Sequence, residues 1–80
     1  MNNMNEEKQW WVFTFGYGQK HEGHYVKIYG TFNIARQKMF DRFGSDWSFQ
    51  YSLEEWEEWE YTRLPYLPAE TMLEEIGEEV

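Results

Sequence analysis

Trp10-Trp11-Val12-Phe13-Thr14-Phe15 is the most apolar run in this chain of 80 residues, and it decides the fold. The run is aromatic and β-branched and contains no proline or glycine, which is typical of a β-strand. Successive side chains of a strand point to opposite faces. One face therefore carries Trp11, Phe13 and Phe15, and the other carries Trp10, Val12 and Thr14. Because large side chains lie on both faces, we predict a strand over residues 9–15 in the centre of a sheet.

Two further segments alternate as strands do, and a loop separates them from the first strand. This loop, residues 16–23, has three glycines that end the first strand, and it is too long for a two-residue hairpin turn. The second strand is expected over 24–29, with Val26 and Ile28 on one face. The third is expected over 47–51, with Trp47, Phe49 and Tyr51 facing a helix.

That helix is predicted over residues 31–43, where apolar residues fill one continuous arc of the helical wheel. Thr31 or Asn33 would cap its start, and Gly44 is well placed to end it. Arg36 falls inside the apolar arc. Either its stem packs while its charged head reaches water, or it forms an ion pair across the rim of the core.

A second helix is predicted from Ser52 to about residues 61–63. Ser52-Leu53-Glu54-Glu55 is a capping box, in which the serine caps the helix and the third residue after it reaches back. The apolar side of this helix carries Leu53, Trp56 and Trp59.

The element order β-β-α-β-α predicts a small single α+β domain over 1–80. Its sheet would be three-stranded and antiparallel in the order 2-1-3, packed by a helix. Residues 1–8 are expected to be a flexible N-terminus, and 64–80 an acidic, proline-containing tail. Within the tail, Pro68 would start a short helix that places Met72, Leu73 and Ile76 on one face.

The charge is concentrated at the C-terminal end. Residues 1–51 hold six Lys/Arg and five Asp/Glu, a balance of +1, whereas residues 52–80 hold ten Glu and one Arg, a balance of −9, which gives the net −8. Such a chain repels nucleic acid and anionic membranes and suits a basic partner; the alternative is a surface that only solvates the protein.

The cysteine content, the apolar runs and the N-terminus indicate the cellular compartment. There is no cysteine, and no apolar run approaches the length of a membrane span. The polar, acidic N-terminus is wrong for a signal peptide, so we expect a protein of the cytoplasm.

Candidate chemistry is sparse. His21 and His24 are too few for a zinc site, and Gly16-x-Gly18 lacks the third glycine and the Lys-Ser/Thr pair of a phosphate loop. No nucleophile motif is present, and the carboxylates lie on a helix face that is expected to be solvated. The sequence therefore predicts no enzyme, no metal and no cofactor.

The acidic helix face is the strongest functional signal, and its residues are Glu54, Glu55, Glu57 and Glu58. With Glu60, five carboxylates span about 9 Å of helix axis, or one charge per about 2.3 Å. Duplex DNA carries one charge per about 1.7 Å, so a groove that binds phosphates would accept this helix. Ordinary solvated helices also reach this density.

Aromatic residues offer a second signal. Five Trp, six Tyr and six Phe exceed the needs of one small core. A protein-protein interaction module would use them, with Tyr17, Tyr25, Tyr29 and Trp10 as contacts. We also predict that the loop 16–23 is mobile and part of a binding surface, through Tyr17 and Lys20.

Several short segments form a pattern that extends over most of the chain: Phe13-Thr14-Phe15-Gly16-Tyr17-Gly18-Gln19, Tyr25-Val26, Ala35-Arg36-Gln37-Lys38-Met39-Phe40, Phe43-Gly44, Trp47-Ser48-Phe49-Gln50-Tyr51-Ser52 and Glu55-Trp56. This pattern resembles a family of small uncharacterised proteins from phages and prophages of Gram-positive bacteria. The segments cover about residues 10–60, and the family carries no assigned catalytic residues.

The resemblance implies a phage setting and the cytoplasm of a host cell. Small acidic phage proteins without cysteine are often inhibitors of host defence, including anti-CRISPR proteins that mimic DNA. The sequence therefore favours such an inhibitor, a monomer or weak homodimer that occupies the basic groove of a host defence nuclease without contacting nucleic acid. The alternative is a phage accessory protein that binds other proteins through an aromatic surface.

Overall fold

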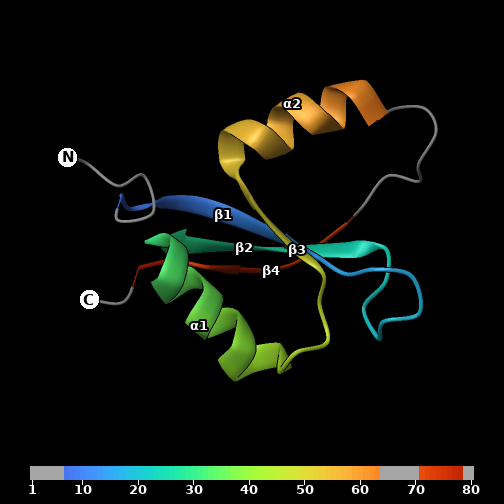
Figure 1. The fold of residues 1–80 in the computed structure, drawn as a ribbon, viewed down its shortest axis with the longest axis horizontal. Helices are drawn as coiled ribbons and strands as arrows, with labels where there is room; N and C mark the ends of the chain where they lie inside the picture. The colour runs from blue at the N-terminus through green and yellow to red at the C-terminus, as the bar shows by residue number, and fades with distance from the viewer. Residues whose placement is uncertain (1–6, 64–70, 79–80) are drawn as a thin grey trace.

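The computed structural model describes residues 7–63 and 71–78, and Figure 1 shows how their elements are arranged. These elements are β1 (Gln9–Thr14), β2 (His24–Gly30), α1 (Phe32–Phe43), β3 (Phe49–Ser52), α2 (Leu53–Arg63) and β4 (Thr71–Ile76). They form a small α+β domain with a mixed four-stranded sheet in the order β3-β1-β2-β4. Helices α1 and α2 lie on opposite faces of this sheet (Figure 1). No helix among the described residues is both long enough and apolar enough to cross a membrane.

The central position predicted for the first strand is confirmed. β1 pairs antiparallel with β2 on one side, where Trp11 lies opposite Ile28, and with β3 on the other, where Phe13 lies opposite Gln50. Interior strands need apolar side chains on both faces, and Val12 and Phe13, which point to opposite faces, are fully buried.

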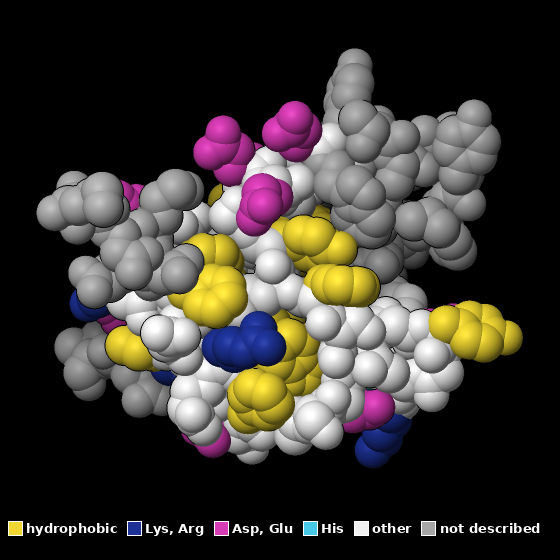
Figure 2. Space-filling view, in the orientation of Figure 1, with side chains coloured by type: hydrophobic (Ala, Val, Ile, Leu, Met, Phe, Trp, Pro, Cys, Tyr) yellow, Lys and Arg dark blue, Asp and Glu magenta, His cyan; other side chains and the backbone are white. Residues whose placement is uncertain are grey.

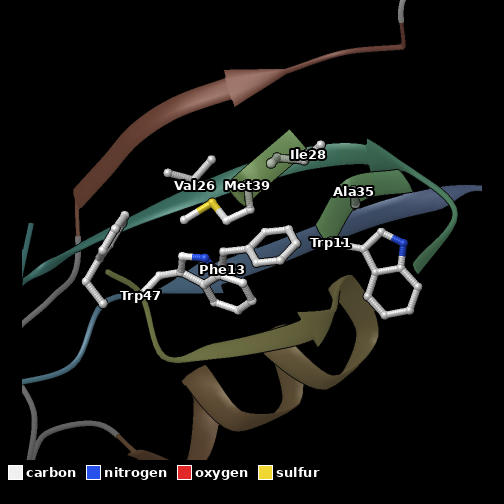
Figure 3. Packing of buried hydrophobic residues seen from close by; sticks show 8 residues of the cluster. Trp11, Phe13, Val26, Ile28, Ala35, Met39 and Trp47 are labelled. Atoms are coloured by element: carbon white, nitrogen blue, oxygen red, sulfur yellow. The ribbon is translucent and has the colours of Figure 1, made fainter. Parts of the chain in front are cut away.

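The main core lies between the sheet and α1 (Figure 3). Its buried residues are Trp11, Phe13, Phe15, Val26, Ile28, Ala35, Met39 and Trp47. Both tryptophans of this core have a partner for the indole N–H group: Trp11 Nε1 donates to Gly30 O at 2.9 Å, and Trp47 Nε1 donates to Gly44 O at 2.9 Å. The rings therefore contribute apolar area without leaving a buried donor unsatisfied.

Helix α1 begins and ends close to the predicted residues. Thr31 is the N-cap, since its Oγ1 accepts the N–H of Ile34 at 3.1 Å. Gly44 ends the helix with a φ of 64°, and its N–H donates to Phe40 O at 2.8 Å. Glycine adopts this φ without the steric cost that other residues bear.

The prediction of a helix after Pro68 is wrong, because residues 71–76 form β4, parallel to β2. The order 2-1-3 had left one edge of β2 open, and β4 pairs with that edge and supplies hydrogen-bond partners. Ile76 packs against the core opposite Ile28, and Arg42 of α1 forms an ion pair with Glu74 at 2.5 Å. A sheet with a parallel pair replaces the purely antiparallel sheet that was expected.

The faces predicted for the third strand are also wrong. Trp47 packs on Phe13 in the core, but residues 46–48 are not strand, and β3 begins only at Phe49. The side chains of β3 therefore alternate in the opposite sense to the one predicted from Trp47. Gln50 faces α1, where its Nε2 donates to Phe32 O at 3.0 Å, and Tyr51 faces α2. Phe49, expected in the core, is 62% exposed.

The two predicted terminal segments are described only in part. Residues 1–6, 64–70 and 79–80 lie outside the described residues. Lys8, at the end of the expected flexible N-terminus, forms an ion pair with Glu78 at 3.1 Å.

Candidate functional site

The acidic face of α2 is positioned by a capping box and by one tryptophan. Ser52 N donates to Glu55 Oε1 at 2.9 Å, and Glu55 N donates to Ser52 Oγ at 3.1 Å, which confirms the predicted capping box. Trp56, one turn later, is 4% exposed. Its ring contacts Tyr25 at 5.1 Å and Tyr51 at 6.0 Å between centroids. These contacts hold α2 on the sheet face opposite the main core.

Docking through Trp56 turns the glutamates outward. Glu54, Glu55, Glu57 and Glu58 are all exposed, as the helical pattern predicted. Glu55 differs from the other three, because one of its oxygens already accepts the hydrogen bond of the capping box. The side chain of Glu60 lies outside the described residues.

A groove of about 720 Å³ runs along the inner side of these glutamates. Its lining residues are Glu7, Gln9, Trp11, Phe32, Gln50, Ser52, Glu54, Glu55 and Glu58. Carboxylates from the N-terminal side of β1 and from α2 thus border an aromatic floor. Glu57 does not line the groove, so the acidic face has a groove side and an outer side.

Arg36 occupies the rim between α1 and β3, in an arrangement that matches neither sequence interpretation in full. Its guanidinium carbon lies 4.9 Å from the ring centroid of Trp47 and 5.8 Å from those of Phe32 and Phe40. Its Nη1 donates to Gln50 Oε1 at 3.2 Å. Three rings and one amide therefore hold the charged group itself, which is a cation–π site at the edge of the core.

The loop 16–23 places Tyr17 and Lys20 on the surface, and Tyr17 is 97% exposed. The loop backbone forms successive turns, and three hydrogen bonds tie the loop to the rest of the domain. Lys20 N donates to Asp46 Oδ2 at 3.1 Å, Ser48 Oγ donates to Gln19 Oε1 at 3.0 Å, and Thr71 N donates to Gly23 O at 3.1 Å. A Cβ at Gly16 would clash with Ser48 Oγ, so the loop begins at a close backbone approach. The mobility of the loop and its role in binding stay predictions.

The four aromatic residues proposed from the sequence do not form one exposed surface. Tyr25 packs on Trp56, and Trp10 packs edge-on against Tyr29 at 5.4 Å with Lys27 over its ring. Tyr17 lies apart from them in the loop. The exposed phenylalanines are instead Phe40 and Phe49, at 40% and 62%, and sequence reasoning assigned both to the core. The sequence feature that indicates the surface around Phe40 and Phe49 is Arg36, a charged residue inside the apolar arc of the helix.

The two histidines have different neighbours. His21 contacts the rings of Phe15 and Phe43, whereas His24 Nδ1 lies 3.3 Å from Thr71 O. Among the side chains that the structure describes, in residues 7–58 and 71–78, no group of three or more His, Cys, Asp or Glu is arranged to hold a metal ion.

No protein-family model, curated protein or solved structure matches this chain, so its function is argued from the geometry of these surfaces.

Proposed function

We propose that the protein is an inhibitor that binds a basic protein surface through the acidic face of α2. The observation that carries the proposal is the set of four exposed glutamates on one docked helix. In the phage setting that the sequence resemblance implies, the target is the nucleic-acid groove of a host defence nuclease, and the protein acts as an anti-CRISPR inhibitor.

Rigid presentation is what separates this face from an acidic tail. Trp56 and the capping box fix the helix, so the carboxylates need little further ordering when a partner binds. A groove that binds phosphates presents Lys and Arg at a spacing suited to a polyanion. Glutamates on successive turns of α2 would pair with those side chains and block the groove without any chemical step.

The test is a plasmid-interference assay in cells that express the CRISPR effector. Glu54, Glu57 and Glu58 are changed together to Gln, and Glu55 is left in place because it caps the helix. The matched control is Asp41→Asn, Glu75→Gln and Glu78→Gln, which removes the same number of carboxylates from surfaces outside α2 and the loop 16–23. The amide at position 41 keeps an acceptor oxygen for its hydrogen bond, and the Lys8–Glu78 ion pair that is lost is exposed and contributes little to stability.

We expect the α2 variant to lose inhibition by at least about tenfold and the control to keep it, because only the first removes the contacts with the basic groove. Binding to the purified effector should also weaken steeply with salt. Inhibition that survives in the α2 variant, or that is lost equally in the control, contradicts the proposal.

A further inference from the structure

One face of the molecule carries opposite charges around an exposed aromatic surface. Figure 2 shows basic, hydrophobic and acidic side chains together on this face, with acidic side chains over α2. Gln50 connects the two charged parts, because it accepts the hydrogen bond from Arg36 and also lines the groove with Glu54 and Glu58. Phe32 likewise lies beside Arg36 and lines the groove. The guanidinium and the carboxylates therefore share Gln50 of β3, an edge strand of the sheet, and Phe32 as common neighbours.

Neither charge is neutralised within the described part of the chain. Among the side chains of residues 7–58 and 71–78, the ion pairs are Lys8–Glu78 and Arg42–Glu74, and neither includes Arg36, Glu54 or Glu58. The one hydrogen bond of Arg36 goes to a neutral amide, so most of its N–H donors remain available. Three ring contacts hold its guanidinium in place, so it is already ordered for a carboxylate.

Exposed apolar area lies beside these charges. Phe40 contacts Arg36 and is 40% exposed, and Phe49, next to Gln50 in the chain, is 62% exposed. Aromatic residues and arginine are the residue types that dominate binding energy at protein interfaces. A face that combines an aromatic surface with an unpaired arginine and unpaired glutamates is complementary to itself.

We propose that this face is an interface between two copies of the chain. A two-fold axis that passes between Arg36 and Glu58 brings Arg36 of each copy to Glu58 of the other, and it covers Phe40 and Phe49 on both copies. The net charge of −8 on each copy does not prevent this. Charges more than about 8 Å apart are screened at physiological salt, and the domain measures 38 × 26 × 20 Å, so most of the repulsion is weak.

The dimer covers Glu58, one of the glutamates proposed to bind the target, so dimerisation and target binding would compete for this residue. The inference goes beyond the proposed inhibition and is tested without the target, by sedimentation equilibrium of the full chain in about 0.15 M salt. The variants are Arg36→Glu and Glu58→Arg, alone and mixed in equal amounts. In a dimer of either variant alone, both contacts between positions 36 and 58 are between like charges. In the mixed dimer, both contacts are again between opposite charges.

The control is Glu57→Arg, which changes the net charge by the same amount as Glu58→Arg. Glu57 is adjacent to Glu58 in α2 but does not line the groove. We expect the wild type and the control to form dimers, and each single variant to dimerise at least about tenfold more weakly. The equimolar mixture should dimerise within about threefold of the wild type.

A second arm does not depend on Arg36, whose ring contacts Arg36→Glu also removes. Phe49→Thr, at an exposed position, should weaken dimerisation at least about tenfold and leave the unfolding temperature nearly unchanged at concentrations where both proteins are monomeric. A wild type that is monomeric up to about millimolar concentration overturns the proposal. The proposal is also overturned if mixing Arg36→Glu with Glu58→Arg does not restore dimerisation, or if Glu57→Arg dimerises as weakly as Glu58→Arg. A monomer that still inhibits leaves the proposed function standing, and a dimer that does not inhibit leaves this interface standing.

Discussion

Trp56→Ala is expected to undock α2 while the core beneath α1 stays folded. The Trp56 side chain is 4% exposed and contacts Tyr25 and Tyr51. An indole of this kind buries about 150–250 Å², which corresponds to about 4–6 kcal/mol at ~25 cal/mol per Å². Truncation of a buried tryptophan to alanine costs about 3–5 kcal/mol. A domain of 80 residues has a free energy of unfolding of about 4–12 kcal/mol, so the loss is a large fraction of the total.

The loss should fall mainly on α2 because this helix has no other buried tryptophan among its described side chains. With 11 residues, α2 is too short to remain helical in water without its tertiary contacts. Helix α1, in contrast, packs on the core of the opposite sheet face through Ala35 and Met39. Local opening of α2 is therefore expected to precede global unfolding.

Amide hydrogen exchange measures this difference, together with urea unfolding. In Trp56→Ala, the amides of residues 53–63 should lose protection while those of 32–43 keep it. Trp10→Ala is the control, since Trp10 is half-buried on the same sheet face but packs on Tyr29, and its loss should cost about 2 kcal/mol without exposing α2. Unchanged protection of α2 in Trp56→Ala, or a loss below about 1 kcal/mol, would refute the reasoning.

Two further predictions concern β4 and the loop. Ile76→Ala should lower the free energy of unfolding in urea by about 1–2 kcal/mol, because Ile76 packs against the core. Leu73 is 38% exposed and lies where the register between β2 and β4 shifts, since Tyr25 pairs with Met72 and Val26 with Glu74, so Leu73→Ala should cost less than about 0.5 kcal/mol. Equal costs would contradict the placement of β4. The double variant Tyr17→Ala, Lys20→Ala should change stability by less than about 0.5 kcal/mol, since both side chains are exposed, and it should weaken inhibition in the plasmid assay if the loop contacts the target. Unchanged inhibition would show that the loop only connects two strands.

Local signals in the sequence were sufficient where the physical cause is local. The capping box of α2 depends on hydrogen bonds between Ser52 and Glu55, three residues apart. The end of α1 depends on the positive φ of Gly44. The alternation of Val26 and Ile28 depends on the pleat of a single strand, and both are fully buried as predicted. The outward direction of the glutamates follows from helical periodicity once Trp56 is buried.

The remaining features depend on partners distant in the chain. Residues 71–76 became a strand because the edge of β2 was open, and no pattern within those residues indicates that edge. Trp47 and Gln50 share a face only because the chain departs from strand geometry between them. Arg36 was noticed in the sequence, but the three rings that hold it come from α1 and from the segment before β3. The sequence by itself determined β1, β2, both helices and the acidic face of α2, because each rests on bonds and periodicities within one segment. Only the tertiary structure decided the fourth strand and the joining of Arg36 to the acidic groove, because both rest on long-range packing.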